Sequence, residues 1–305
     1  MSSFRPDPNL LKKHPNAVTV DQLGERDRLL GVLLGHAAGE ALAASGAGSR
    51  EVTSGEAGPA AAMTLAVLRT LVARGKLDLL VLGTEYLRWF ATKPARLGKT
   101  TRAALESLRA GEENPGAIAW EDAGRKAATP GSVACAAPVG VFHARSLEGL
   151  AEDAAALSRL THYDPRCVGA AVAVATAAAL LVRGEADEAI ERAAGAGRAY
   201  SDDVGAAVER GAQKRIEQLQ LEGEGRGTAL LVVEAAFCAL AHATSVEDGL
   251  TGLVIRGAEP AAAAVAGALL GGRFGKSAVP DRWTKKLAAA PELASLGEQL
   301  WKKRA

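Results

Sequence analysis

The chain has 305 residues, of which 48% are apolar, so it is long enough to bury one large hydrophobic core or two modest ones. Its formal net charge is only +1, from 36 Lys and Arg against 35 Asp and Glu, and no global field attracts nucleic acid or an anionic membrane. The three cysteines, Cys135, Cys167 and Cys238, are widely spaced in apolar sequence, which argues against a disulfide framework or a zinc site. We therefore expect no nucleic-acid partner and no membrane partner.

The first twenty residues contain three prolines and several charges, but they lack the apolar stretch of a signal peptide. We also find no charge-free apolar run that is long enough to span a bilayer. These observations predict an extended N-terminal arm at residues 1–25, a single helical domain at residues 26–305, and a cytoplasmic location.

Aromatic residues make up only 4% of the chain, whereas alanine is abundant and glycines number 34, a balance that favours closely packed helices. Apolar residues recur about every 3.6 positions in some eight segments, which predicts helices at residues 28–44, 60–73, 79–90, 147–160, 167–182, 186–199, 228–242 and 262–274. Residues 45–58 and 114–132, which are rich in Gly, Ser or Pro, are expected to be surface loops, and residues 222–227 an exposed turn. The predicted fold class is all-α.

Glycines recur every four residues on one face of the first predicted helix, at Gly31, Gly35 and Gly39. On spacing alone, this pattern predicts a face on which another helix packs closely. The segment also resembles the opening signature of the ADP-ribosylglycohydrolases, where the same glycines lead to Gly-Asp-Ala-Leu-Gly. In this chain Glu40 stands at the position of the Asp, and Ala43 at that of the last Gly.

Further stretches follow in the order of that family, so the resemblance covers most of the chain. Residues 130–140 are similar to the family's Asn-Gly-Ser-x-Met-Arg-x-x-Pro-x-Gly segment, although a proline, an alanine and a cysteine replace its Asn, Met and Arg. Residues 160–166 resemble its Leu-Thr-His segment, and residues 264–275, with Pro280 and Trp283, resemble its last core helix and closing loop. The resemblance implies a compact orthogonal bundle of helices.

The two segments that supply metal ligands in the family are the ones that differ here. The family's Trp-Thr-Asp-Asp-Thr provides oxygen ligands to a pair of magnesium ions, and alignment on Met63 places the Ala-Gly-Pro-Ala-Ala of residues 57–61 there. The second ligand motif, Gly-Gly-Asp-Ala-Asp-Thr, aligns its ligand positions with Ala258, Pro260 and Ala261. Magnesium requires negative oxygens in octahedral geometry, and none of these side chains has an oxygen. The resemblance therefore implies that the magnesium of the family is not bound, and we expect no cofactor.

Carboxylates near these positions leave an alternative open. Glu40, Glu56 and Glu259 lie within a few residues of the missing ligands and would rebuild a carboxylate site if their side chains converged. The other interpretation is that they are solvated or stabilise a helix dipole. A further carboxylate that the family carries near the scissile bond aligns with Ala47, so it too is absent.

The predicted ligand-binding residues are His162, Gly131, Ser132 and Glu40, and no catalytic or metal-binding residue is predicted. The family uses the region of His162 near its ligand, but Thr161 could instead cap a helix while His162 bonds to backbone. Gly131 and Ser132 either bind a phosphate through backbone donors or form a plain turn.

Three functional hypotheses follow. The first is a catalytically inactive protein of the ADP-ribosylglycohydrolase type, a pseudoenzyme that binds ADP-ribose, a nucleotide-like ligand or a protein partner. The second is a hydrolase of an ADP-ribosyl or related N- or O-glycosidic bond that uses a non-standard or metal-free site. The third is a structural subunit of an assembly.

Overall fold

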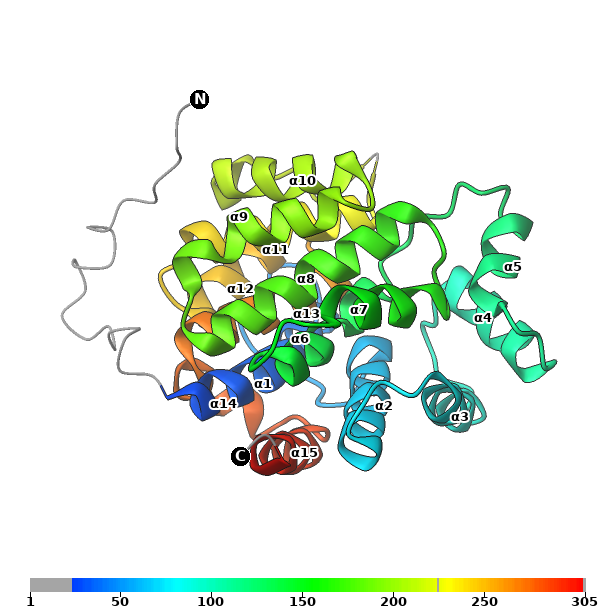
Figure 1. Ribbon diagram of the computed structural model, residues 1–305. Helices are drawn as coiled ribbons and strands as arrows, with labels where there is room; N and C mark the ends of the chain where they lie inside the picture. Colours follow the sequence, from blue (N-terminus) through cyan, green and yellow to red (C-terminus); the bar gives the residue numbers. More distant parts are fainter. Residues whose placement is uncertain (1–23, 224, 304–305) are drawn as a thin grey trace.

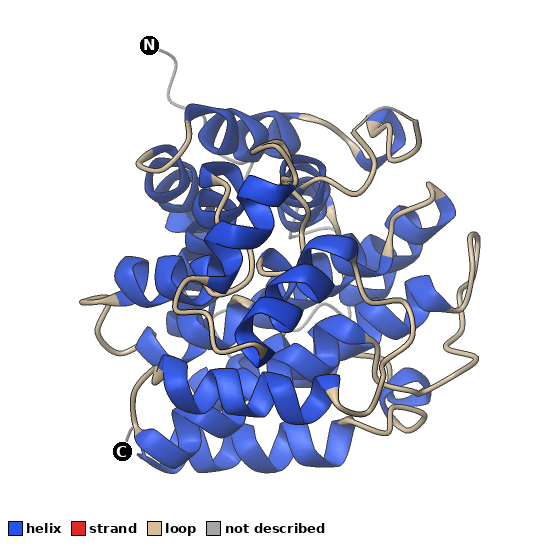
Figure 2. Cartoon of the chain, turned by 90° about the vertical axis from the view of Figure 1, so that its right-hand side faces the viewer, coloured by secondary structure: helices blue, strands red, loops and turns tan. Residues whose placement is uncertain are grey.

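The computed structural model describes residues 24–223 and 225–303, and in that part of the chain it contains fifteen α-helices and no strand (Figures 1 and 2). The all-α prediction is therefore confirmed. Residues 1–23 of the predicted N-terminal arm lie outside the described residues, and the first helix begins at Glu25.

Within the described residues, three 3-10 turns lie among the helices. In chain order they are α1 (Glu25–Ala44), α2 (Pro59–Arg74), α3 (Leu79–Phe90), α4 (Lys99–Arg109), α5 (Pro115–Asp122), η3 (Val133–Cys135), α6 (Ala137–His143), α7 (Leu150–Arg159), α8 (Pro165–Arg183), α9 (Ala186–Arg198), α10 (Asp202–Gln213), η4 (Ile216–Gln218), α11 (Ala229–His242), α12 (Val246–Ile255), α13 (Pro260–Phe274), η5 (Lys276–Ala278), α14 (Asp281–Thr284) and α15 (Ala290–Lys303).

The predicted glycine face of α1 packs against α13, and the two helices run antiparallel. Three pairs of small residues face each other along this contact: Gly31 with Gly271, Gly35 with Gly267, and Gly39 with Ala263. A Cβ added at Gly35 would lie 2.2 Å from the carbonyl oxygen of Gly267, so the two backbones touch without side chains between them. This contact fixes the C-terminal end of α1 beside the N-terminal end of α13.

The hydrophobic core surrounds α8, in which every residue from 167 to 182 is buried. By length and composition, this helix alone in the described chain would be able to cross a membrane, although we expected no such run. In the fold, however, 89% of its apolar window is buried by other helices, which is the environment of a core helix. The three cysteines are free and buried, as their apolar neighbours predict.

All eight predicted helices are present, as α1, α2, α3, α7, α8, α9, α11 and α13. The prediction missed seven others, which are short or have polar residues that interrupt their apolar spacing. One of them, α5, lies inside the predicted loop at residues 114–132 and begins at Pro115, where a proline costs no backbone hydrogen bond. The predicted loop at residues 45–58 is confirmed, because no helix occurs between Ser45 and Gly58.

The edge of the molecule on the right of Figure 1 is built by α3, α4 and α5, which follow one another outward from α2. Nearer the centre, the N-terminal end of α2 meets the C-terminal half of α1. The turn η3 and the connection between α7 and α8 also meet there. The residues that the family resemblance singles out are therefore brought into one region of the fold.

Candidate functional site

Glu40 is buried at the junction of α1 and α2, with 3% of its surface exposed. Its two carboxylate oxygens accept hydrogen bonds from the backbone N–H groups of Ala60 and Ala61, each at 2.8 Å. These two residues stand where the family's metal-binding motif has side-chain oxygens. Gly58, the N-cap residue of α2, has no side chain to satisfy these donors, so Glu40 caps the helix from α1.

Burial and hydrogen bonding have opposite effects on the pKa of Glu40. Burial raises the pKa of the Glu40 carboxyl, while hydrogen bonds from the backbone of Ala61, Ala60 and Gly58 act in the opposite direction. The carboxylate also fills the space beside Gly58, because a Cβ added to that glycine would lie 2.4 Å from Oε1 of Glu40. Of the two interpretations left open for Glu40, solvated or helix-stabilising, the second is correct: the buried side chain stabilises the N-terminus of α2.

His36 lies one helical turn before Glu40 and is buried, as a packed core histidine. Its Nε2 donates to the carbonyl oxygen of Ala134 and lies 3.3 Å from the hydroxyl of Thr64, so it ties α1 to η3 and α2. Because Nε2 carries the proton, Nδ1 is an acceptor, and this buried atom has no hydrogen-bond partner in the described structure. Burial lowers the pKa of His36 to about 4, which keeps the ring neutral at pH 7.

The residues that were aligned with the family's second ligand motif lie at the start of α13. Ala258 and Pro260 flank Glu259 at the start of α13, and the Glu259 carboxylate pairs with Arg226 at 2.9 Å. Glu56 is exposed on the loop before α2. The three glutamates thus have different surroundings, and in the described part of the chain no three His, Cys, Asp or Glu residues lie close enough to hold a metal ion together.

His162, Gly131 and Ser132 do lie together, as their predicted shared role requires. The His162 side chain is 1% exposed, and its two nitrogens bond to the hydroxyls of Thr161 at 2.8 Å and Thr129 at 3.1 Å. A Cβ on Gly131 would lie 2.6 Å from the imidazole, so only glycine permits this packing. Burial lowers the pKa of His162 to about 4, and the ring is neutral at pH 7.

The alternative interpretation, in which Thr161 caps a helix and the His162 side chain bonds to backbone, is wrong. Helix α8 begins at Pro165, and its cap is Asp164, whose carboxylate accepts the backbone N–H of Arg166 at 2.9 Å. The His162 side chain bonds to hydroxyl groups and not to backbone. Sequence reasoning missed Asp164 as the cap, although an Asp followed directly by Pro is a helix-start signal.

Ser132 is buried, and its hydroxyl bonds to that of Ser158 at 2.9 Å. Ser158 in turn donates to the carbonyl oxygen of His162. Thr101, at the start of α4, contributes a hydroxyl that would lie 2.8 Å from a Cβ on Gly131. Ser132, Ser158, Thr129, Thr161 and His162 are therefore joined by hydrogen bonds, with the hydroxyl of Thr101 beside Gly131. Sequence reasoning did not identify Thr101, Thr129 or Ser158 as members of this cluster.

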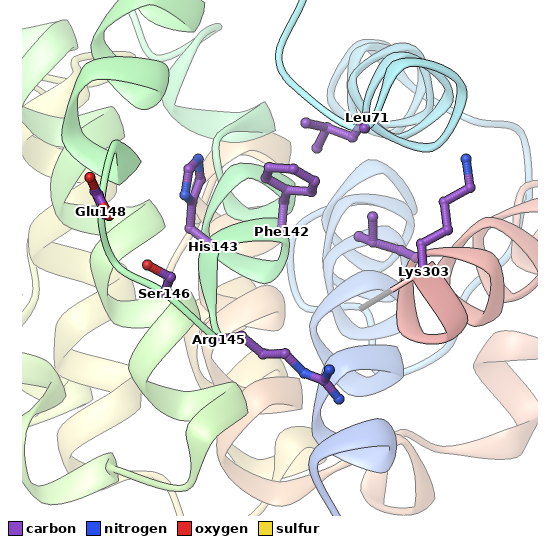
Figure 3. A pocket seen from close by; sticks show the side chains of 9 residues that line it. Leu71, Phe142, His143, Arg145, Ser146, Glu148 and Lys303 are labelled. Atoms are coloured by element: carbon purple, nitrogen blue, oxygen red, sulfur yellow. The ribbon is translucent and has the colours of Figure 1, made fainter. Parts of the chain in front are cut away.

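A cavity of about 430 Å³ lies elsewhere, at the C-terminal end of α2 (Figure 3). Figure 3 shows Phe142 between His143 and Leu71, with Lys303 of α15 on the opposite wall. Helix α2 has sixteen residues, so its two ends are about 24 Å apart. None of the four predicted ligand-binding residues lines this cavity.

Comparisons with known proteins agree with the resemblance that the motifs carry. The ADP-ribosylglycohydrolase family model matches residues 21–305. The chain is 26% identical over 302 residues to the ADP-ribosylarginine hydrolase Tri1 of Pseudomonas putida, which covers 90% of this chain and 78% of that protein. It is 24% identical over 303 residues to Tri1 of Serratia proteamaculans, with 90% and 79% covered.

A solved structure described as an ADP-ribosylglycohydrolase-related protein complex superposes with a TM-score of 0.77 and 27% identity, over 91% of this chain and 98% of that one. Its fold agrees with the predicted bundle of helices. With the family model matching nearly the whole chain, this protein belongs to the ADP-ribosylglycohydrolase family.

Proposed function

We propose that this chain is a non-hydrolytic member of the ADP-ribosylglycohydrolase family, which binds a ligand of the ADP-ribose class without magnesium. The observation that carries the proposal is the position of Glu40. Its two carboxylate oxygens accept backbone N–H groups of Ala60 and Ala61, and both bonds are 2.8 Å long. A carboxylate engaged in this way stabilises the N-terminus of a helix.

The donor set around Glu40 also supports the proposal. Magnesium keeps several waters and binds through a few carboxylates in a strict geometry. Ala60, Ala61 and Pro260 offer no side-chain oxygen, and Glu259 is paired with Arg226. The residues present therefore do not fit a pair of magnesium ions, and we derive no hydrolytic step through a metal.

The protonation of His162 supports a binding role over acid-base catalysis. A general acid or base works best with a pKa near the operating pH, and burial holds the pKa of His162 at about 4. Both ring nitrogens are also bonded to threonine hydroxyls, at 2.8 and 3.1 Å. The cluster of Gly131, Ser132 and His162 is thus a buried group of hydrogen-bonded side chains, and we assign it to ligand recognition.

The test is a calorimetric titration with ADP-ribose, once with magnesium and once with a chelator, together with an assay for release of ADP-ribose from an ADP-ribosylated arginine substrate. We expect the same Kd in both buffers and no release. Binding that requires magnesium, or release above the background rate, would overturn the proposal. Failure to bind ADP-ribose in either buffer would reject the ligand class and favour a structural subunit.

A further inference from the structure

A second cavity, of about 370 Å³, lies between the C-terminal end of α3 and the exposed face of α4 (both labelled in Figure 1). Its apolar wall is formed by Phe90, Ala91 and Pro94. A volume of this size is within the range of small-molecule sites. The cavity has no part in the function proposed above, because none of the residues around Glu40 or His162 lines it.

Cations surround this cavity in a regular arrangement. Arg102, Glu106 and Arg109 lie four and three residues apart on α4, so they share one face of the helix, and Lys93 adds a third cation from the loop before it. Within residues 24–223 and 225–303, none of the three cations forms an ion pair. Arg109 is held over the ring of Phe90, with 5.5 Å between its guanidinium carbon and the ring centroid.

The cavity of Figure 3 differs in this respect, because its cations already serve the fold. The ammonium group of Lys303 donates to the carbonyl oxygen of Val72. The guanidinium of Arg145 stacks on Trp301, 5.6 Å from the ring centroid. An anionic ligand there would have to displace these contacts, whereas Lys93 and Arg102 are free of such partners.

The local charge is far from the balance of the whole chain. Residues 88–109 contain six Lys and Arg and a single acid, Glu106, whereas the chain as a whole carries +1. Of these six cations only Arg88 is paired with a carboxylate, that of Glu85. The first turn of α4 adds the positive end of a helix dipole, since it has no acidic residue and no side-chain cap. Glu112 and Glu113 follow α4 at its other end.

The loop between α3 and α4 holds two cations in a costly backbone conformation. Lys93 has φ of 55° and Arg96 has φ of 59°, in the left-handed region that favours glycine. Arg125 is the one other described residue besides glycine with positive φ. Strained backbone conformations are concentrated at binding and active sites, and here a lysine occupies a position where glycine would be unstrained.

We propose that the cavity between α3 and α4 binds a small phosphorylated molecule of nucleotide size, with its phosphates at Lys93 and Arg102 and its apolar part against Phe90 and Pro94. Guanidinium and ammonium groups form charge-assisted hydrogen bonds with phosphate oxygens, which are the strongest hydrogen bonds available to a partly exposed site. The apolar wall suits a planar ring. The site is independent of the function proposed above, because it needs neither Glu40 nor His162.

The first experiment titrates the full chain with inorganic triphosphate and with ADP, in a chelating buffer at low salt. Arg102→Glu is compared with Arg256→Glu, a matched control that changes the net charge equally at an exposed arginine at the end of α12. We expect Arg102→Glu to weaken binding at least tenfold, and Arg256→Glu to change it less than twofold. Equal losses in the two variants, or no binding by the wild type at 1 mM triphosphate, would overturn the proposal.

The second variant separates binding from folding. Lys93→Gly removes a cation and relieves a positive φ, so we expect a Tm about 1–2 °C higher and a several-fold weaker affinity for triphosphate. ADP-ribose is added as a competitor to distinguish this site from the cluster at His162. Displacement of triphosphate by ADP-ribose with no effect of Arg102→Glu would place the phosphates at His162 and overturn the proposal. Tighter binding of a hexaglutamate peptide than of triphosphate would reject a small ligand.

Discussion

Glu40 of α1 accepts the backbone N–H of Ala61 of α2 at 2.8 Å, so one side chain closes the N-terminus of a neighbouring helix. By the resemblance of the motifs, Glu40 stands at the position of an Asp in the family signature, and Ala60 and Ala61 at positions of side-chain oxygens. Glutamate is longer than aspartate, and in this chain Glu40 reaches the backbone N–H groups of Ala60 and Ala61, whose own side chains are only methyl groups. The replacements at the three positions therefore form one consistent packing arrangement.

Removal of this cap is expected to destabilise the fold strongly. Glu40→Ala leaves the buried N–H groups of Ala60 and Ala61 without an acceptor, and each costs about 1–3 kcal/mol. We expect the free energy of unfolding, measured in urea, to fall by roughly 3 kcal/mol or more. The exposed Glu56→Ala serves as a control and is expected to change it by less than about 0.5 kcal/mol. A loss below 1 kcal/mol for Glu40→Ala would contradict the capping role.

Glu40 and Gly58 are expected to be energetically coupled. A Cβ at Gly58 would lie 2.4 Å from Oε1 of Glu40, so Gly58→Ala forces the carboxylate away from α2 and costs about 1–3 kcal/mol. In a Glu40→Asp background the shorter side chain leaves room, and the same substitution is expected to cost less. A double-mutant cycle measures the difference, for which we expect at least about 1 kcal/mol. Strict additivity would show that the two residues do not compete for space.

The contact between α1 and α13 gives a sharper stability prediction. Gly35→Ala places a methyl group 2.2 Å from the carbonyl oxygen of Gly267, and the nearest atoms that it meets all belong to the backbone of α13. We expect a loss of more than about 3 kcal/mol, or no folded protein at all, by thermal unfolding. Gly195→Ala in α9 is the matched control, because no atom lies within 4 Å of its added Cβ. That variant is expected to gain about 0.5–1 kcal/mol, and a similar loss in both would refute the close approach.

The buried histidines predict a loss of stability in acid. Burial lowers the pKa of both His36 and His162 from 6.5 to about 4, so between these pH values the unfolded chain binds more protons than the folded one. Their contribution is complete above pH 6.5 and falls as the pH drops toward 4, by about 3 kcal/mol for each ring.

Glu40 acts with the opposite sign, because its pKa is raised, so the test compares variants with the wild type. Urea unfolding at pH 7 and pH 5 is measured for the wild type and for His162→Gln. We expect the variant to lose less stability than the wild type between these two pH values. The same pH dependence in both proteins would show that His162 does not titrate between the folded and unfolded states.

Much of the architecture was predictable because its signals are local. The spacing of Gly31, Gly35 and Gly39 predicts a close helix contact, and the structure supplies the partner, α13. Helices such as α4 and α10 were missed, since polar and charged residues interrupt their apolar spacing and only part of each helix is buried. Their position depends on the neighbouring helices, which a local pattern does not contain.

The candidate site was only partly predictable for a related reason. The resemblance predicts that ligand oxygens of the family are absent, which stays a prediction, and it singled out His162, Gly131 and Ser132, which lie together in the fold. It did not reveal that Glu40 bonds to α2, because that contact joins residues 20 positions apart through backbone atoms that have no sequence signature. The hydroxyls of Thr101 and Thr129 were missed because their places beside Gly131 and His162 depend on how α4 and the loop before η3 pack together.

The contact between α1 and α13 places three pairs of small residues backbone to backbone, with no side chain between the two helices. This backbone contact fixes the positions of the helix ends, and it does not involve the side chains at those ends. Ligands at the end of α1, the start of α2 and the start of α13 can therefore be exchanged without moving the frame that positions them. A family member can keep the packing of α1 against α13, so its chemistry has to be established from the residues at the helix ends.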